Sequence, residues 1–171
     1  MIQIYTGDGK GKTTAAVGLA VRCAGSGGRV LFGQFLKDNT SSELRILSGI
    51  SNIQQIPPVV CRKFYYQMKA EEKENLKKQE ENYFRALVST AEKTRCDMVV
   101  LDEALPAVNL KLIALQEMEN FLKAQGTKRE IVLTGRDAPD SLIELADYVS
   151  EICKRKHPYD RGTGARKGIE Y

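Results

Sequence analysis

Short apolar runs alternate with amphipathic stretches along most of the chain. Such runs predict strands, and their nearly unbroken apolar character is typical of strands that are buried on both faces of a sheet. We therefore expect strands at residues 2–5, 30–36, 98–101, 130–134 and 148–152.

The stretches between these runs carry apolar residues at helical spacing. In residues 68–95, for example, Leu76, Tyr83, Leu87 and Ala91 recur on one helical face. The same periodicity predicts helices at residues 12–24, 43–47, 68–95, 110–123 and 139 to about 146. Residues 50–66 include the pair Pro57-Pro58 and fit neither pattern.

Strands that alternate with helices predict right-handed crossovers, and hence a mostly parallel sheet with helices on both faces. A length of 171 residues favours a single α/β domain, residues 1–171. Ligands of such sheets bind at the carboxyl ends of the strands. Functional residues are therefore expected directly after the strands.

The net charge of +4 lies in the last residues of the chain. Residues 154–171 hold six basic and two acidic side chains, and the remaining residues balance at 20 of each sign. A neutral body with a basic end indicates local anion handling rather than a nucleic-acid surface, although a merely solubilising terminus is an equal alternative. We expect no nucleic-acid partner.

The four cysteines are widely separated and have no metal-ligand spacing. They predict buried, reduced thiols, and a zinc site is not expected because His157 is the one histidine. No apolar run is long enough for a membrane span, and the first residues do not resemble a secretory signal. We therefore expect a cytoplasmic protein that has no membrane partner.

A glycine- and lysine-rich segment follows the first predicted strand and opens the first predicted helix. This context is typical of a P-loop, in which backbone N–H groups and the helix N-terminus bind phosphates. Lys12 would contact phosphate oxygens, and the hydroxyl of Thr13 would bind Mg²⁺. The loop is a variant, because Thr6 stands where the usual pattern begins with glycine. The predicted nucleotide-binding residues are Gly7, Asp8, Gly9, Lys10, Gly11, Lys12, Thr13 and Thr14.

Two carboxylates, Asp102 and Glu103, end the predicted strand 98–101. In P-loop proteins an acid at this place holds Mg²⁺ directly or through water. Together with Thr13 they form the predicted metal site of a P-loop NTPase-like fold.

Five segments of this sequence also resemble a known family. GDGKGKTTAA, VVLDE, LTGRDAP, LADYVSE and KHPYDRGTGARKGIEY follow one another as in the P-loop type of ATP:cob(I)alamin (corrinoid) adenosyltransferases. The resemblance covers residues 2–171. It implies transfer of the 5′-deoxyadenosyl group of ATP to a reduced corrinoid, in cobalamin biosynthesis or salvage, with release of triphosphate. It also implies a homodimer, an unusual orientation of ATP and an electron donor such as a reduced flavoprotein.

The residues suit this chemistry. Cob(I) is itself a strong nucleophile and carries no proton, so the enzyme supplies positioning and charge stabilisation rather than a general base. Lys10, Lys12 and Arg136 are the predicted catalytic residues, with Mg²⁺ and the basic segment 154–171 completing the site. Arg136 could equally pair with Asp137.

The family commonly carries Phe and Trp near the corrinoid. The corresponding stretch here is residues 63–66, and the chain has no Trp. Phe64, Tyr65, Tyr66 and His157 are therefore the candidate corrinoid contacts. Core packing is an alternative for the three aromatic residues, and a cap of the C-terminal turn is an alternative for His157. Two other functions remain open: a small-molecule kinase on the same nucleotide core, and a non-enzymatic ATP-binding module that uses its basic end to bind RNA.

Overall fold

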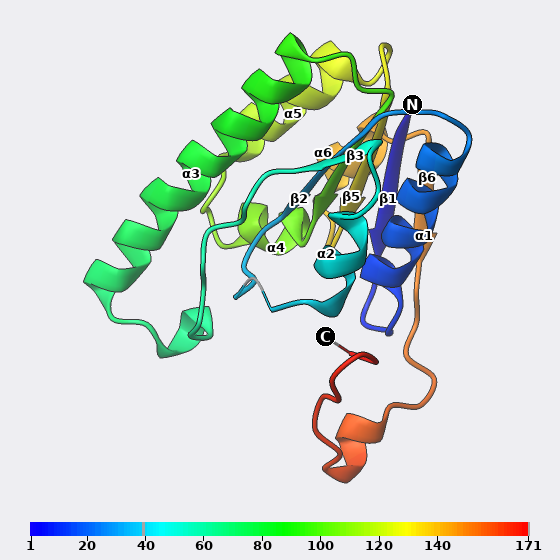
Figure 1. Ribbon diagram of the computed structural model, residues 1–171. Helices are drawn as coiled ribbons and strands as arrows, with labels where there is room; N and C mark the ends of the chain where they lie inside the picture. The colour runs from blue at the N-terminus through cyan, green and yellow to red at the C-terminus, as the bar shows by residue number, and fades with distance from the viewer. Residues whose placement is uncertain (39, 171) are drawn as a thin grey trace.

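Parallel strands form a six-stranded sheet in the computed structural model, which describes residues 1–38 and 40–170 (Figure 1). Their order is β3-β2-β4-β5-β1-β6, so chain neighbours are joined by crossovers, as predicted. The strands are β1 (Ile2–Thr6), β2 (Val30–Gln34), β3 (Ile53–Gln55), β4 (Met98–Asp102), β5 (Glu130–Thr134) and β6 (Tyr148–Glu151).

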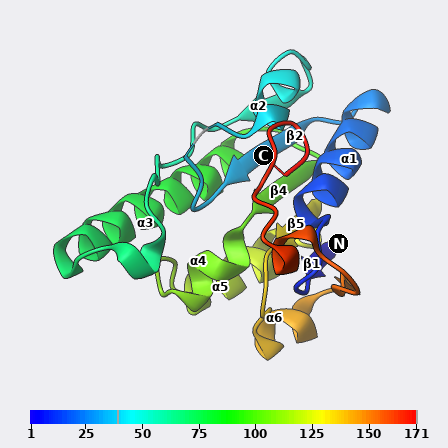
Figure 2. The same ribbon diagram turned by 90° about the horizontal axis from the view of Figure 1, so that it is seen from below.

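Helices cover both faces of this sheet, as Figures 1 and 2 show. One face packs against α1 (Lys12–Gly25) and α2 (Ser42–Leu47). The other packs against α3 (Ala70–Lys93), α4 (Ala104–Asn109), α5 (Leu115–Gln125) and α6 (Asp140–Leu145). In α1 the buried residues Ala16, Ala20 and Ala24 recur every fourth position, and their small size lets the helix lie close to the sheet. The predicted fold class is confirmed.

The register of the central strands aligns the ends that carry the motifs. Gln34 pairs with Asp102 across β2 and β4, and Tyr5 pairs with Thr134 across β1 and β5. Because all these strands run parallel, their carboxyl ends meet at one edge of the sheet. That edge holds the loop after β1 and the acids after β4.

Several predicted boundaries were wrong. Residues 50–66 contain β3, which the sequence pattern did not predict, and a short 3₁₀ turn follows at Tyr65–Gln67. The predicted helix 110–123 begins only at Leu115, and α4 precedes it. Pro106 lies in the first turn of α4, where a missing N–H group removes no intrahelical bond.

The predicted strand 30–36 ends at Gln34, since Leu36 takes a left-handed conformation with φ 55°. The strand near 148–152 was expected to be buried, but all four residues of β6 are exposed because β6 lies at the sheet edge. The four cysteines are free, as predicted, yet Cys153 is exposed and Cys96 alone is fully buried. Within the described residues, every helix is too short or too polar to cross a bilayer.

Candidate nucleotide-binding site

The loop between β1 and α1 has a backbone that requires glycine at several positions. Gly7 has φ 100° and Gly11 has φ 128°, values that disfavour other residues. Gly9 lies against the chain after β6, where its N–H group donates to the carbonyl of Ile152 at 2.7 Å. A Cβ atom at Gly9 would lie 2.6 Å from that carbonyl oxygen. The loop is therefore shaped by its own glycines and by the segment after β6.

Lys12 lies inside the curve of this loop. Its ammonium group donates to the carbonyls of Gly7 at 2.7 Å and Gly9 at 2.8 Å, and the residue is almost completely buried. Burial lowers the pKa of Lys12, while the carboxylate of Glu103 opposes that shift. The cation is therefore held in the hollow of the loop by neutral backbone acceptors.

Asp102 is fully buried and is held by side chains from three other elements. Its Oδ1 accepts hydrogen bonds from the hydroxyls of Thr13 at 2.8 Å and Thr134 at 2.6 Å. Its Oδ2 accepts from the amide of Gln34 at 3.1 Å. A buried carboxylate with this many donors is fixed in orientation, and it fixes the Thr13 hydroxyl in turn.

Glu103 follows in a left-handed conformation, with φ 56°, at the start of α4. Its backbone N–H donates to the hydroxyl of Thr134 at 2.9 Å. Burial, and then the charge of Asp102, raise the pKa of its carboxyl group, and Lys37 is the foremost of the cations that oppose this. Unlike Asp102, Glu103 lines the open cavity at the sheet edge.

That cavity has a volume of about 250 Å³ and a mainly polar wall. Several predicted residues lie together in it: Asp8 to Thr14, Glu103, Arg136 and His157. Gly7 and Asp102 are not among its lining residues; Gly7 shapes the loop and Asp102 lies behind Thr13. Among the described ion pairs, Arg136 has none with Asp137, and Arg136 lines the cavity.

Three lining residues were missed from the sequence: Lys37, Ile169 and Glu170. Lys37 follows β2, so the rule that functional residues follow strands could have found it. Ile169 and Glu170 follow no strand and belong to no phosphate-binding pattern, so no local signal marks them.

The C-terminal segment crosses the same sheet edge, as the red ribbon in Figure 2 shows. The backbone N–H of Lys154 donates to Asp8 at 2.8 Å, and this bond is the largest cause of the lowered pKa of Asp8. Farther along, the guanidinium of Arg166 pairs with the carboxylate of Glu170 at 2.9 Å. The tail is thus connected to the loop at one end and borders the cavity at the other.

The three candidate aromatic residues do not share one environment. Phe64 and Tyr66 are 68% and 74% exposed, and their rings stack with centroids 5.5 Å apart. Tyr65 packs against the core and lies beneath the ammonium of Lys73, 4.8 Å from the ring centroid. Core packing therefore explains Tyr65, and the exposed pair remains available for a ligand.

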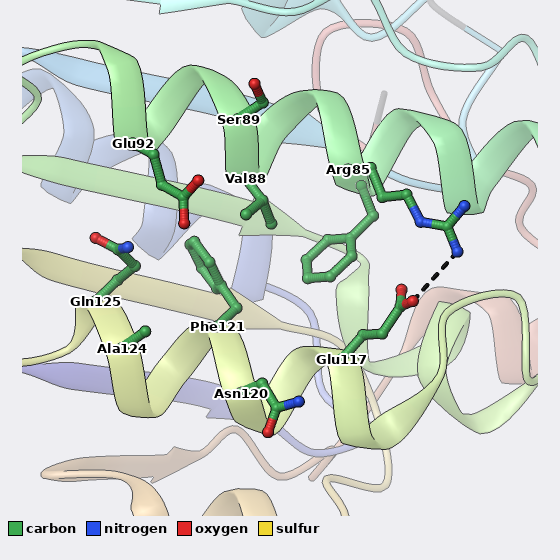
Figure 3. Close-up of a pocket in the computed structure, with 10 residues that line it drawn as sticks. Arg85, Val88, Ser89, Glu92, Glu117, Asn120, Phe121, Ala124 and Gln125 are labelled. Carbon is green, nitrogen blue, oxygen red and sulfur yellow. Dashed lines mark hydrogen bonds and ion pairs between the residues drawn. The ribbon is translucent and has the colours of Figure 1, made fainter.

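A second cavity, of about 430 Å³, lies between α3 and α5 (Figure 3). Phe84 and Phe121 are among its lining residues. Arg85 forms an ion pair with Glu117 at 3.2 Å, which Figure 3 marks with a dashed line. It shares no residue with the cavity at the loop and contains none of the predicted site residues.

A parallel sheet, a glycine-rich loop closed around a lysine, and a buried acid at the end of another strand of the sheet define a P-loop nucleotide-binding protein. The solved structure of Thermomonospora curvata EccC (ATPases 2 and 3) has a similar fold, with a TM-score of 0.51 and 18% identity over 88% of this chain and 30% of that one.

A family model described as ATP:corrinoid adenosyltransferase BtuR/CobO/CobP matches residues 1–171. The corrinoid adenosyltransferase of Escherichia coli K12 is 32% identical, over 100% of this chain and 85% of that protein. The corrinoid adenosyltransferase CobA of Salmonella typhimurium has the same identity and coverage. The chain belongs to the ATP:corrinoid adenosyltransferase family, which confirms the resemblance seen in the sequence.

Proposed function

We propose that this protein transfers the 5′-deoxyadenosyl group of ATP to the Co(I) of a reduced corrinoid and releases triphosphate. In this reaction a Co–C5′ bond forms, the C5′–O bond breaks, and its electron pair leaves with the triphosphate. The observation that carries the proposal is the cation-lined P-loop cavity in a chain that matches this family along its whole length.

The triphosphate would lie in the P-loop. Backbone N–H groups of the loop and the N-terminus of α1 suit an anion there. Lys12 would exchange its bonds to the carbonyls of Gly7 and Gly9 for bonds to phosphate oxygens. Lys10 and Arg136 line the same cavity and would stabilise the charge that develops on the leaving group.

Mg²⁺ fits the residues at this edge. The hydroxyl of Thr13 and the carboxylate of Glu103 both line the cavity, whereas Asp102 lies behind Thr13 and would act by orienting it. The described residues hold no cluster of three or more His, Cys, Asp or Glu suited to a metal, so phosphate oxygens and water would complete the coordination, as Mg²⁺ prefers. The ion would neutralise charge on the triphosphate.

The corrinoid would lie beside this cavity. The stacked pair Phe64 and Tyr66 and the cavity residue His157 remain its candidate contacts. His157 also caps the short turn at Pro158–Arg161, as the sequence allowed, because its Nδ1 accepts the N–H of Tyr159 at 3.1 Å. We also propose, from the resemblance, a cytoplasmic homodimer that works with an electron donor such as a reduced flavoprotein. Analytical ultracentrifugation tests the dimer, and a monomer at micromolar concentration would contradict it.

An anaerobic assay with ATP, Mg²⁺ and cob(I)alamin tests the activity. The expected products are a light-sensitive adenosylcobalamin, followed by its absorbance, and triphosphate. ADP would instead favour a kinase, and salt-sensitive RNA binding without turnover would favour the non-enzymatic alternative.

Lys12→Ala should abolish turnover and retain the fold, as circular dichroism would show. Lys128→Ala removes an exposed lysine far from the loop and serves as the matched control. Normal turnover by Lys12→Ala would contradict the assignment of the loop.

A further inference from the structure

Glu170 places a negative charge in a cavity suited to polyphosphate. Two other acids line that cavity, but each already has a role: Asp8 accepts the N–H of Lys154, and Glu103 is the proposed metal ligand. Like charges repel strongly in such a site, so a phosphate group is a poor partner for Glu170. A group that donates hydrogen bonds suits it better.

Arg166 holds this carboxylate in place. Its Nη2 donates to Oε1 of Glu170 at 2.9 Å, and its Nε donates to Oε2 at 3.2 Å. The backbone N–H of Arg166 also donates to Oε2, at 2.8 Å. The Arg166 side chain is 58% exposed and that of Glu170 is 20% exposed, so the arginine lies outside and the glutamate borders the cavity.

The carboxylate is charged over the whole physiological range. The hydrogen bonds from Arg166 lower the pKa of Glu170 to about 2, and the charge of Lys10 contributes a smaller part. The chain turns between Arg166 and Glu170, with Gly168 at φ 75°, and this turn brings the two side chains together. Glu170 is therefore a fixed acceptor.

An ionised carboxylate has about four lone-pair sites. Among the described residues, Arg166 donates twice to Oε2 and once to Oε1, which leaves a single acceptor site on Oε1. In ATP the donor groups nearest to the polyphosphate are the ribose hydroxyls, since the base lies beyond the sugar. A single hydroxyl matches the single free site.

We propose that Glu170 accepts a hydrogen bond from one ribose hydroxyl of ATP and so selects ribonucleotides, with Arg166 as its positioning residue. This inference rests on the proposed binding of ATP in the P-loop cavity. Carboxylates elsewhere recognise ribose in the same way.

Nucleotide affinity tests the proposal independently of adenosyl transfer. Isothermal titration calorimetry measures the Kd of ATP, 2′-deoxyATP and 3′-deoxyATP in the presence of Mg²⁺. The wild-type protein should bind one deoxynucleotide roughly 10- to 100-fold more weakly than ATP, the range for a hydrogen bond to a charged group. The other analogue should bind about as well as ATP.

In Glu170→Ala the affinity for ATP should fall to that for the disfavoured analogue, so that their ratio approaches one. Arg166→Ala should reduce the same ratio in part, which a general loss of folding would not do. Glu144→Ala removes an exposed carboxylate on α6 and should keep the wild-type ratio.

Two results would overturn the inference: equal wild-type affinity for all three nucleotides, or an unchanged ratio in Glu170→Ala. The proposed function is judged separately. If the protein binds ATP more tightly than one deoxy analogue but transfers no adenosyl group to cob(I)alamin, the proposed function is refuted and the role of Glu170 is supported. If it transfers the adenosyl group but binds all three nucleotides equally, the proposed function is supported and the role of Glu170 is refuted.

Discussion

Glu80 is a buried acid on α3 whose ionisation should make the protein's stability depend on pH. The residue is completely buried, and its Oε1 accepts the N–H of Leu36 at 3.1 Å. Its Oε2 has no hydrogen-bond partner among the described residues. Burial raises the pKa of Glu80 from 4.5 to about 7, and the bond from Leu36 only partly opposes this.

The direction in which stability changes with pH follows from which state of the protein binds the proton. Between pH 4.5 and about 7 the folded protein holds this proton and the unfolded chain has lost it, so stability falls as pH rises through that window. The raised pKa of Glu80 corresponds to a loss of roughly 3 kcal/mol in the free energy of unfolding at a pH where Glu80 is ionised in both the folded and the unfolded state. Glu80→Gln keeps an acceptor for Leu36 and removes the charge, so the variant should not show this loss.

Urea unfolding of both proteins at pH 5 and pH 8.5 tests this expectation. The wild type should lose about 2 to 3 kcal/mol more unfolding free energy than Glu80→Gln when the pH is raised from 5 to 8.5. Glu92→Gln changes an exposed glutamate on the same helix and should follow wild type. If the difference between Glu80→Gln and wild type were the same at both pH values, the buried ionisation would be refuted.

Three further substitutions test the site. Gly9→Ala should weaken ATP binding at least tenfold by calorimetry, because the new Cβ would meet the carbonyl of Ile152 at 2.6 Å; unchanged affinity would contradict the packing of the loop. Thr134→Val should lower the unfolding free energy by about 1 to 3 kcal/mol in urea, since a buried Asp102 oxygen loses a donor; no loss would mean that this bond adds little. Phe64→Ala should raise the KM for corrinoid several-fold and leave the melting temperature unchanged, because the ring is exposed; an unchanged KM would exclude it as a contact.

The sequence predicted the P-loop because the signals for that feature are local. Glycines set the turn, an apolar strand precedes it and a helix follows, all within residues 2–25. The alternation of strands and helices predicted the parallel sheet for the same reason. Once strands are parallel, their carboxyl ends meet, so the sequence alone places Glu103 and Arg136 beside the loop.

The positions of other residues depended on contacts that no local pattern records. Tyr148 and Val149 are apolar enough for a buried strand, yet β6 is exposed because it pairs with β1 alone at the sheet edge.

The sequence by itself determined the class of fold, the phosphate-binding loop and the family, since each depends on contiguous residues. Only the tertiary structure decided that Gln34 and Thr134 hold Asp102 and that Glu170 borders the nucleotide cavity. These residues are separated by many positions along the chain. They lie close together because the strand order places β2, β4 and β5 side by side and because the C-terminal segment crosses the edge of the sheet.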